Sequence, residues 1–396
     1  MGSLTTPPLS LYLHMPWCVR KCPYCDFNSY TLRDTLPDTA YVAALERDIE
    51  SQAPQLRSRP IVSIFFGGGT PSLFAPEAIG RVLETARRHL DIAPDAEVTL
   101  EANPGTIERG RFVGYRGAGI NRVSLGAQSF DVRQLEALGR IHSPQETVRA
   151  AEELHAAGLP NFNLDLMYAL PGQDLAGALG DVEQALALGP AHLSHYQLTL
   201  EPGTQFAANP PTLPPDDAAA DIMSACQDRL ALAGFAQYEV SAYASEGRQC
   251  RHNLNYWTFG DYLGVGAGAH GKLTSASAGL IVRTTQQREP RRYQAASPAA
   301  IAREPVANRD LPFEFMMNAL RLTEGFDVAI FTARTGLEWS AVEPVLEALR
   351  ARKLVVMEGA TCKGTPQGLR FLNEVLLEFL PQKTVLAGKR VMSTGS

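Results

Sequence analysis

The chain has 396 residues and a formal net charge of -6, with 45% hydrophobic and 20% charged residues. These values are typical of a globular protein with room for one large domain and a smaller one. The acidic balance argues against a nucleic acid as the main partner. The absence of an apolar run of about 18 residues argues against a transmembrane segment. With no secretory signal at the N-terminus, we expect a cytoplasmic protein with reduced thiols.

Between residues 9 and 234, short apolar runs alternate with segments of helical periodicity. Strands are predicted at Leu9–His14, Ile61–Phe66, Glu97–Glu101, Ile120–Leu125, Asn161–Leu166 and His192–Leu198. Helices are predicted at Thr39–Ala53, Pro76–Leu90, Ile107–Gly117, Ser143–Ala157, Asp174–Leu188 and Asp216–Ala233. Such alternation predicts an α/β fold, with a parallel sheet and helices outside it. Six βα units are fewer than the eight of a closed barrel, so we expect an open partial (β/α)6 barrel.

The alternation ends after Gly234, and the rest of the chain is expected to form two further parts. Residues 241–304 are expected to be a connecting segment of loops and short strands after a core of residues 1–240. Residues 305–396 are expected to form a smaller α+β domain that resembles a winged helix. Its elements are predicted at Leu311–Leu322, Ser340–Arg352, Leu354–Glu358 (a strand), Lys363-Gly364 (a turn) and Gln367–Leu380. Without a basic surface, this domain is interpreted as a lid or a docking module for a partner.

Three cysteines lie close together near the N-terminus: Cys18, Cys22 and Cys25, spaced Cys-x3-Cys-x2-Cys. Three thiolates on one short loop can hold three irons of a cubic iron–sulfur cluster and leave the fourth iron open to a small molecule. A disulfide framework would need an oxidising compartment. A zinc site would need a fourth ligand from a distant part of the chain, such as Cys226, Cys250, Cys362 or His14. The spacing therefore favours a 4Fe-4S cluster.

Glycines and polar residues follow the predicted strands at their carboxyl ends, where open parallel sheets bind ligands. The second strand is followed by Gly67-Gly68-Gly69-Thr70-Pro71, whose glycines let the backbone approach a ligand closely. Glu101 ends the third strand and can accept hydrogen bonds from ribose hydroxyls. Gln128, Arg140 and Asp165 come at or near later strand ends, and the Arg140 guanidinium can pair with a carboxylate. Each residue alone is better explained as a helix cap or a surface group, but their occurrence at successive strand ends favours a ligand site.

The cysteine spacing resembles the signature of the radical S-adenosylmethionine (radical SAM) superfamily, in which SAM chelates the open iron. The order of Tyr12-x-His14, the cysteines, GGGTP, Glu101-Ala-Asn-Pro and Leu170-Pro171-Gly172 resembles more narrowly the family of oxygen-independent coproporphyrinogen III oxidase and its haem-chaperone paralogue HemW. This resemblance covers nearly the whole chain and implies a TIM-like partial barrel of the radical SAM type. It implies that one SAM contacts Tyr12, Gly68 and Glu101. It implies that a second SAM, or its surroundings, involves Tyr24, Gly69, Thr70, Gln128, Arg140 and Asp165.

Two departures from the coproporphyrinogen enzyme favour the chaperone paralogue. The enzyme has a further cysteine two residues after the triad, where this chain has Phe27, and it has a longer N-terminal arm than the 17 residues before Cys18. The segment His252-Asn253-Leu254-Asn255-Tyr256-Trp257 also resembles the His-Asn-x-x-Tyr-Trp motif tied to haem in HemW. The His252 imidazole can ligate haem iron, and Tyr256 and Trp257 offer flat apolar faces. Packing within a loop is the alternative role for His252, and Cys250 is an alternative ligand.

The expected cofactors are therefore a 4Fe-4S cluster, SAM and haem. The expected partner is a haem-accepting protein, with the respiratory chain as its candidate location, and peripheral membrane association and a homodimer are further candidates. The competing function is oxidative decarboxylation of two propionates of coproporphyrinogen III to vinyl groups. Radical SAM chemistry on another substrate is a third.

Overall fold

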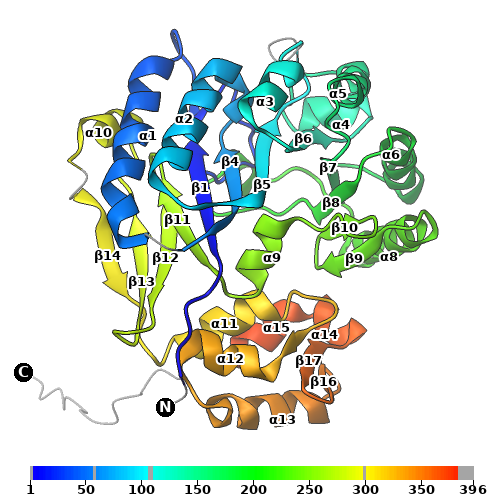
Figure 1. The fold of residues 1–396 in the computed structure, drawn as a ribbon. Helices are drawn as coiled ribbons and strands as arrows, with labels where there is room; N and C mark the ends of the chain where they lie inside the picture. The colour runs from blue at the N-terminus through cyan, green and yellow to red at the C-terminus, as the bar shows by residue number, and fades with distance from the viewer. Residues whose placement is uncertain (1–2, 57–58, 106–109, 298–299, 382–396) are drawn as a thin grey trace, which may run out of the picture.

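The computed structural model describes residues 3–56, 59–105, 110–297 and 300–381 (Figure 1). Its main sheet has twelve strands in the order β14-β13-β12-β11-β1-β4-β5-β6-β7-β8-β10-β9. The six predicted strands are present and parallel, as β1 (Leu9–Met15), β4 (Ile61–Gly68), β5 (Ile92–Ala102), β6 (Arg122–Gln128), β7 (Phe162–Tyr168) and β8 (His192–Gln197). Because the strand order has two ends, the sheet does not close.

Helices that follow these strands pack along the outside of the sheet (Figure 1). They are α1 (Asp38–Gln52), α2 (Pro76–His89), α3 (Phe112–Ala118), α4 (Val132–Ala137), α5 (Pro144–Ala156), α6 (Leu175–Ala187) and α8 (Asp216–Leu232). α5 begins with a capping box, in which the Glu146 side chain accepts a hydrogen bond from the Ser143 backbone N–H at 2.8 Å. α3 begins later than predicted, and positions 107–109 of its predicted range lie outside the described residues.

The segment expected to connect two domains instead extends the main sheet at both edges. β10 (Ala242–Ala244), from this segment, pairs antiparallel with β8, and β9 (Ala236–Glu239), from the end of the predicted core, pairs antiparallel with β10 at the edge. β11 (Asp261–Val265) lies parallel to β1, and the strands beyond it are antiparallel. Those strands are β12 (His270–Ser275), β13 (Leu280–Thr285) and β14 (Ala302–Pro305). The segment also contains two helices that the sequence analysis did not predict, α9 (Arg251–Trp257) and α10 (Pro290–Ala295).

A C-terminal unit lies beside the amino end of the main sheet and has its own apolar core (Figure 1). Its helices are α11 (Leu311–Ala319), α12 (Val328–Thr335), α13 (Glu343–Ala351), α14 (Pro366–Arg370) and α15 (Leu372–Leu377). Its three-stranded sheet has the order β15 (Phe326–Asp327), β17 (Thr361–Gly364), β16 (Val355–Glu358). The turn predicted at Lys363-Gly364 is wrong, because these residues end β17. The chain reverses instead at Gly359, whose φ of +62° suits glycine.

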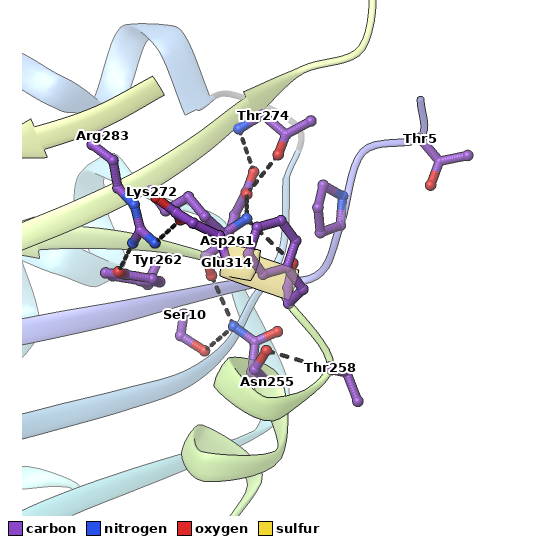
Figure 2. A network of polar contacts seen from close by, with 12 residues as sticks. Thr5, Ser10, Asn255, Thr258, Asp261, Tyr262, Lys272, Thr274, Arg283 and Glu314 are labelled. Atoms are coloured by element: carbon purple, nitrogen blue, oxygen red, sulfur yellow. Dashed lines mark hydrogen bonds and ion pairs between the residues drawn. The ribbon is translucent and has the colours of Figure 1, made fainter. Parts of the chain in front are cut away.

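A buried polar network lies where the main sheet meets the C-terminal unit (Figure 2). The Asp261 carboxylate on β11 accepts hydrogen bonds from Lys272 Nζ at 2.9 Å and from the Thr274 backbone N–H at 2.7 Å. Arg283 on β13 donates to the Tyr262 hydroxyl and to the carboxylate of Glu314 on α11. These contacts fasten α11 to the β11 edge of the sheet.

Candidate functional site

A cavity of about 310 Å³ lies at the carboxyl ends of the parallel strands. Most of the predicted site residues line it, namely Cys18, Cys22, Tyr24, Cys25, Gly68, Gly69, Thr70, Glu101, Gln128, Arg140 and Asp165. Sequence reasoning missed Tyr196, which also lines the cavity and donates a hydrogen bond from its hydroxyl to Gln128 Oε1 at 2.8 Å. Tyr196 stands near the end of the sixth predicted strand, so the carboxyl-end rule could have identified it.

The loop with the three cysteines is held closed at its base. β2 (Trp17–Cys18) pairs in parallel with β3 (Tyr30–Thr31). The Lys21 ammonium crosses the loop and donates to the backbone carbonyls of Phe27 at 3.0 Å and Ser29 at 3.2 Å. The three cysteines are free and only partly buried. The loop therefore presents three thiols to one cavity from a fixed backbone.

The cysteine loop supplies the three thiols that a cubic cluster needs. Within the described part of the chain, no three His, Cys, Asp or Glu side chains are grouped so that they could hold one metal ion. A cubic cluster requires a wider arrangement, because each thiolate binds a different iron. Burial raises the pKa of the Cys18 thiol, so ligation must supply the energy for its ionisation. The Arg140 guanidinium, with Nη1 3.7 Å from Cys22 Sγ, places a positive charge beside the thiols.

Arg140 also ties several strand ends together at the rim of the cavity. Its Nη2 donates to Asn103 Oδ1 at 2.5 Å and to the Gly126 carbonyl at 2.8 Å. The Asn103 amide in turn donates to Thr70 Oγ1 at 2.9 Å. These bonds join the loops that follow β4, β5 and β6 and orient the guanidinium before any ligand binds. A preorganised guanidinium is suited to pairing with a ligand carboxylate.

Two partly buried carboxyl groups, Glu101 and Asp165, also line the cavity. Glu101 Oε2 accepts a hydrogen bond from the Gly68 N–H at 3.1 Å. Burial, together with the nearby Asp165, raises the pKa of Glu101 to about 8. Asp165 accepts hydrogen bonds from Asn163 Nδ2 at 2.8 Å and Ser124 Oγ at 3.2 Å, and burial raises its pKa as well. A cationic group in this cavity would favour the ionised carboxylates, which matches the amino and sulfonium groups of SAM.

The raised pKa of Glu101 makes the ligand-free protein less stable as pH rises. An unfolded glutamate ionises near pH 4.3, whereas Glu101 ionises near pH 8, so the unfolded state binds fewer protons between these values. The free energy of unfolding should therefore fall by roughly 1.4 kcal/mol per pH unit in this window and level off above it. Replacing Glu101 with glutamine should remove the part of this decline that Glu101 causes, which by the same slope amounts to roughly 5 kcal/mol at pH 8.

Urea unfolding of ligand-free protein at pH 5, 6.5 and 8 measures this effect. Glu84→Gln is the matched control, because Glu84 forms an exposed pair with Arg88 and should retain the wild-type pH dependence. Equal slopes for wild type and Glu101→Gln would show that Glu101 ionises normally.

The His-Asn-x-x-Tyr-Trp segment lies away from the cavity, at the amino ends of the strands. It forms α9, where Asn255 Nδ2 donates to Ser10 Oγ near the start of β1 at 2.9 Å (Figure 2). His252 is 5% exposed, and its Nδ1 lies 3.2 Å from Ser63 Oγ near the start of β4. The structure therefore does not bring His252, Tyr256 and Trp257 together with the cysteines.

Aromatic rings enclose His252 within the sheet. Its ring centroid lies 4.7 Å from that of Phe65 in a stacked arrangement and 4.9 Å from that of Tyr256. Burial lowers the pKa of His252 to about 3, so the imidazole is neutral. The Tyr12 ring also stacks with His252 at 6.3 Å, and Tyr12 does not line the cavity. Trp257 contacts the C-terminal unit, with the Arg321 guanidinium carbon 4.4 Å from its ring centre.

Comparison with known proteins supports the radical SAM assignment along the chain. The Radical SAM superfamily model matches residues 12–184, and the HemN C-terminal domain model matches residues 306–371. Heme chaperone HemW of Escherichia coli strain K12 is 49% identical over 376 residues, which cover 95% of this chain and 99% of that protein. The chain belongs to the HemW family. HemW of Haemophilus influenzae is 46% identical over 381 residues, with the same shares covered.

A solved structure confirms the fold of this HemW-family chain. Coproporphyrinogen III oxidase (HemN) from Escherichia coli matches with a TM-score of 0.79 at 22% identity, covering 94% of this chain and 90% of that one. The predicted α/β fold of the radical SAM type, with a separate C-terminal domain, is therefore confirmed. No described helix has both the length and the apolar character needed to cross a membrane.

Proposed function

We propose that this protein is a haem chaperone that binds haem, a 4Fe-4S cluster and SAM, and transfers haem to an acceptor protein. The observation that carries the proposal is the likeness to proteins named haem chaperones over almost the full length of both chains. Phe27 supports it, because this exposed residue at the cavity stands where the coproporphyrinogen enzyme has a further cysteine. An acceptor in the respiratory chain, a homodimer and peripheral membrane association belong to the same proposal.

The cavity residues divide into two proposed roles. Cys18, Cys22 and Cys25 hold three irons of the cluster, and SAM binds the fourth. SAM contacts are proposed for Tyr12, Tyr24, Gly68, Gly69, Thr70, Glu101, Gln128, Arg140 and Asp165. The cavity fits such a ligand, because its acidic residues suit the cationic groups of SAM and Arg140 suits its carboxylate. Tyr12 does not line the cavity, so its proposed contact requires a ligand that reaches deeper or a small rearrangement.

The proposed haem site is the face of α9 that carries His252, Tyr256 and Trp257. A neutral imidazole is the form that ligates iron, which agrees with the low pKa of His252. Phe65 and Tyr256 cover its ring, so haem contact requires α9 to move away from the strands. We therefore infer that haem binds a second arrangement of this helix.

Anaerobic haem titration of cluster-reconstituted protein tests the proposal. We expect a saturable Soret band near one haem per chain, and an affinity at least about tenfold lower for His252→Ala, which corresponds to about 1.4 kcal/mol. His155→Ala is the control, because His155 is an exposed histidine on α5 and should not affect haem. Absence of saturable binding while the cluster is intact would contradict the chaperone function.

The cavity and the HemN-like fold are also compatible with one alternative to the chaperone function, which is an enzymatic activity. In that alternative, the protein converts two propionates of coproporphyrinogen III to vinyl groups. Anaerobic incubation with this substrate, SAM and a reductant should give no catalytic formation of protoporphyrinogen. Repeated turnover would replace the proposed function with the enzymatic one.

A further inference from the structure

A continuous series of buried hydrogen bonds links the cavity to the start of α9. Asp165, which lines the cavity, accepts from Asn163 Nδ2 at 2.8 Å. Asn163 Oδ1 lies 2.6 Å from His192 Nδ1, and His192 Nε2 lies 2.9 Å from the Tyr238 hydroxyl. The Tyr238 oxygen accepts from the backbone N–H of Cys250 at 3.4 Å, and Cys250 is the N-cap residue of α9. The series thus runs from the carboxyl end of the sheet to its amino end.

The donors in this series all point in one direction. Asn163 uses its NH₂ group toward Asp165, so its oxygen must accept from His192. With a proton on Nδ1, His192 is left to accept at Nε2, and Tyr238 must donate its hydroxyl proton there. Burial lowers the pKa of His192 well below its usual value, which keeps the ring neutral and preserves this pattern. Each bond therefore polarises the next toward the Asp165 carboxylate.

A second carboxylate holds the same end of α9. Glu97 on β5 accepts from the Arg251 N–H and the His252 N–H, both at 3.2 Å, and from the Cys250 thiol at 3.3 Å. Glu97 is 8% exposed and does not line the cavity. Tyr238 is the hold on α9 that hydrogen bonds join to the cavity. Glu97 lies outside that hydrogen-bonded series and faces Arg122, whose Nε is 3.9 Å from Glu97 Oε2 and whose charge also acts on Asp165.

We propose that Asn163, His192 and Tyr238 are positioning residues that transmit the occupancy of the SAM cavity to α9. This inference rests on the proposed haem-chaperone function for its meaning, because α9 carries the proposed haem site. Burial raises the pKa of Asp165, so a cationic ligand nearby favours its ionised form. The carboxylate accepts more strongly than the neutral acid, and the cooperative series then holds the start of α9 more tightly. Glu101 and Arg122 are the other charged groups that act on Asp165. Without the ligand, the hydrogen bond between Tyr238 and the Cys250 N–H weakens, and His252 becomes easier to expose.

Hydrogen exchange of residues 250–257 tests the coupling in cluster-reconstituted full-length protein with and without SAM. In the wild type, SAM should slow exchange in α9 by about threefold or more. Tyr238→Phe keeps the ring but breaks the series, so it should lose this SAM effect while binding SAM within about threefold of the wild-type affinity. Tyr115→Phe is the matched control, because its buried hydroxyl donates to the Ser72 and Phe74 carbonyls, outside the series, and its SAM effect should persist.

The proposal is wrong if SAM does not change exchange in wild-type α9, or if the change survives in Tyr238→Phe. His192→Phe breaks the series at another point and replaces Tyr238→Phe if that variant does not fold. It should give the same loss of SAM effect. The haem titration is read separately, so failure to bind haem would contradict the proposed function without deciding the coupling.

Discussion

Replacing Cys22 with alanine is expected to abolish the iron–sulfur cluster. After anaerobic reconstitution, wild-type protein should hold about four irons per chain, and the variant less than about a tenth of that amount. Cys22 lines the cavity with Cys18 and Cys25, so its loss leaves an iron without a protein ligand in a site that has only three. Iron and sulfide analysis, with the absorption spectrum of the cluster, measures the effect. Cys18→Ala and Cys25→Ala should behave alike.

The control for this experiment is Cys362→Ala, which makes the same chemical change in β17 of the C-terminal unit. It should retain the wild-type iron content, because Cys362 is buried in a separate apolar core. SAM affinity should fall with the cluster in the three loop variants and stay unchanged in the control. A full cluster in Cys22→Ala would show that another residue supplies the ligand.

The grouping of most candidate site residues around one cavity could be predicted because it follows from short-range patterns. Most of the apolar runs end at or just before glycine or a polar residue, and parallel strands bring their carboxyl ends to one edge of the sheet. Gly68, Glu101, Gln128 and Asp165 were therefore expected to meet, and they line one cavity. Their side-chain partners did not follow from spacing, because hydrogen bonds such as that from Asn103 to Thr70 depend on loop conformations.

The position of α9 could not be predicted, because long-range pairing determines it. β11 pairs with β1, although about 250 residues separate them, and this return draws α9 across the amino ends of the strands. Seven residues give too little periodicity to indicate a helix. The likeness of His252-Asn253-x-x-Tyr256-Trp257 to a haem motif therefore identified a segment but did not show that His252 is enclosed by Phe65 and Tyr256.

Replacing Asp261 with asparagine is expected to have the largest effect on stability. Asp261 is fully buried and pairs with Lys272 Nζ at 2.9 Å and Arg59 Nη2 at 2.8 Å. The variant keeps the shape of the side chain but leaves two cations without their counter-charge, and Lys272 is 2% exposed. Leaving a buried charge unpaired costs about 3–5 kcal/mol. Denaturant unfolding should show this loss, since the Asp261 carboxylate is at the centre of the network in Figure 2.

Lys272→Met should lower the free energy of unfolding less than Asp261→Asn does. This comparison shows whether an unpaired charge or lost packing causes the destabilisation. Methionine removes the buried ammonium and retains an apolar stem against the Phe259 ring, which lies 4.2 Å from Lys272 Nζ. Asp261 keeps Arg59 and the Thr274 donors, so no charge is left unpaired. Asp95→Asn is the matched surface control and should leave stability nearly unchanged, because its pair with Arg251 is exposed to solvent. If Lys272→Met were as damaging as Asp261→Asn, lost packing rather than an unpaired charge would be the cause, because Lys272→Met leaves no buried charge without a partner.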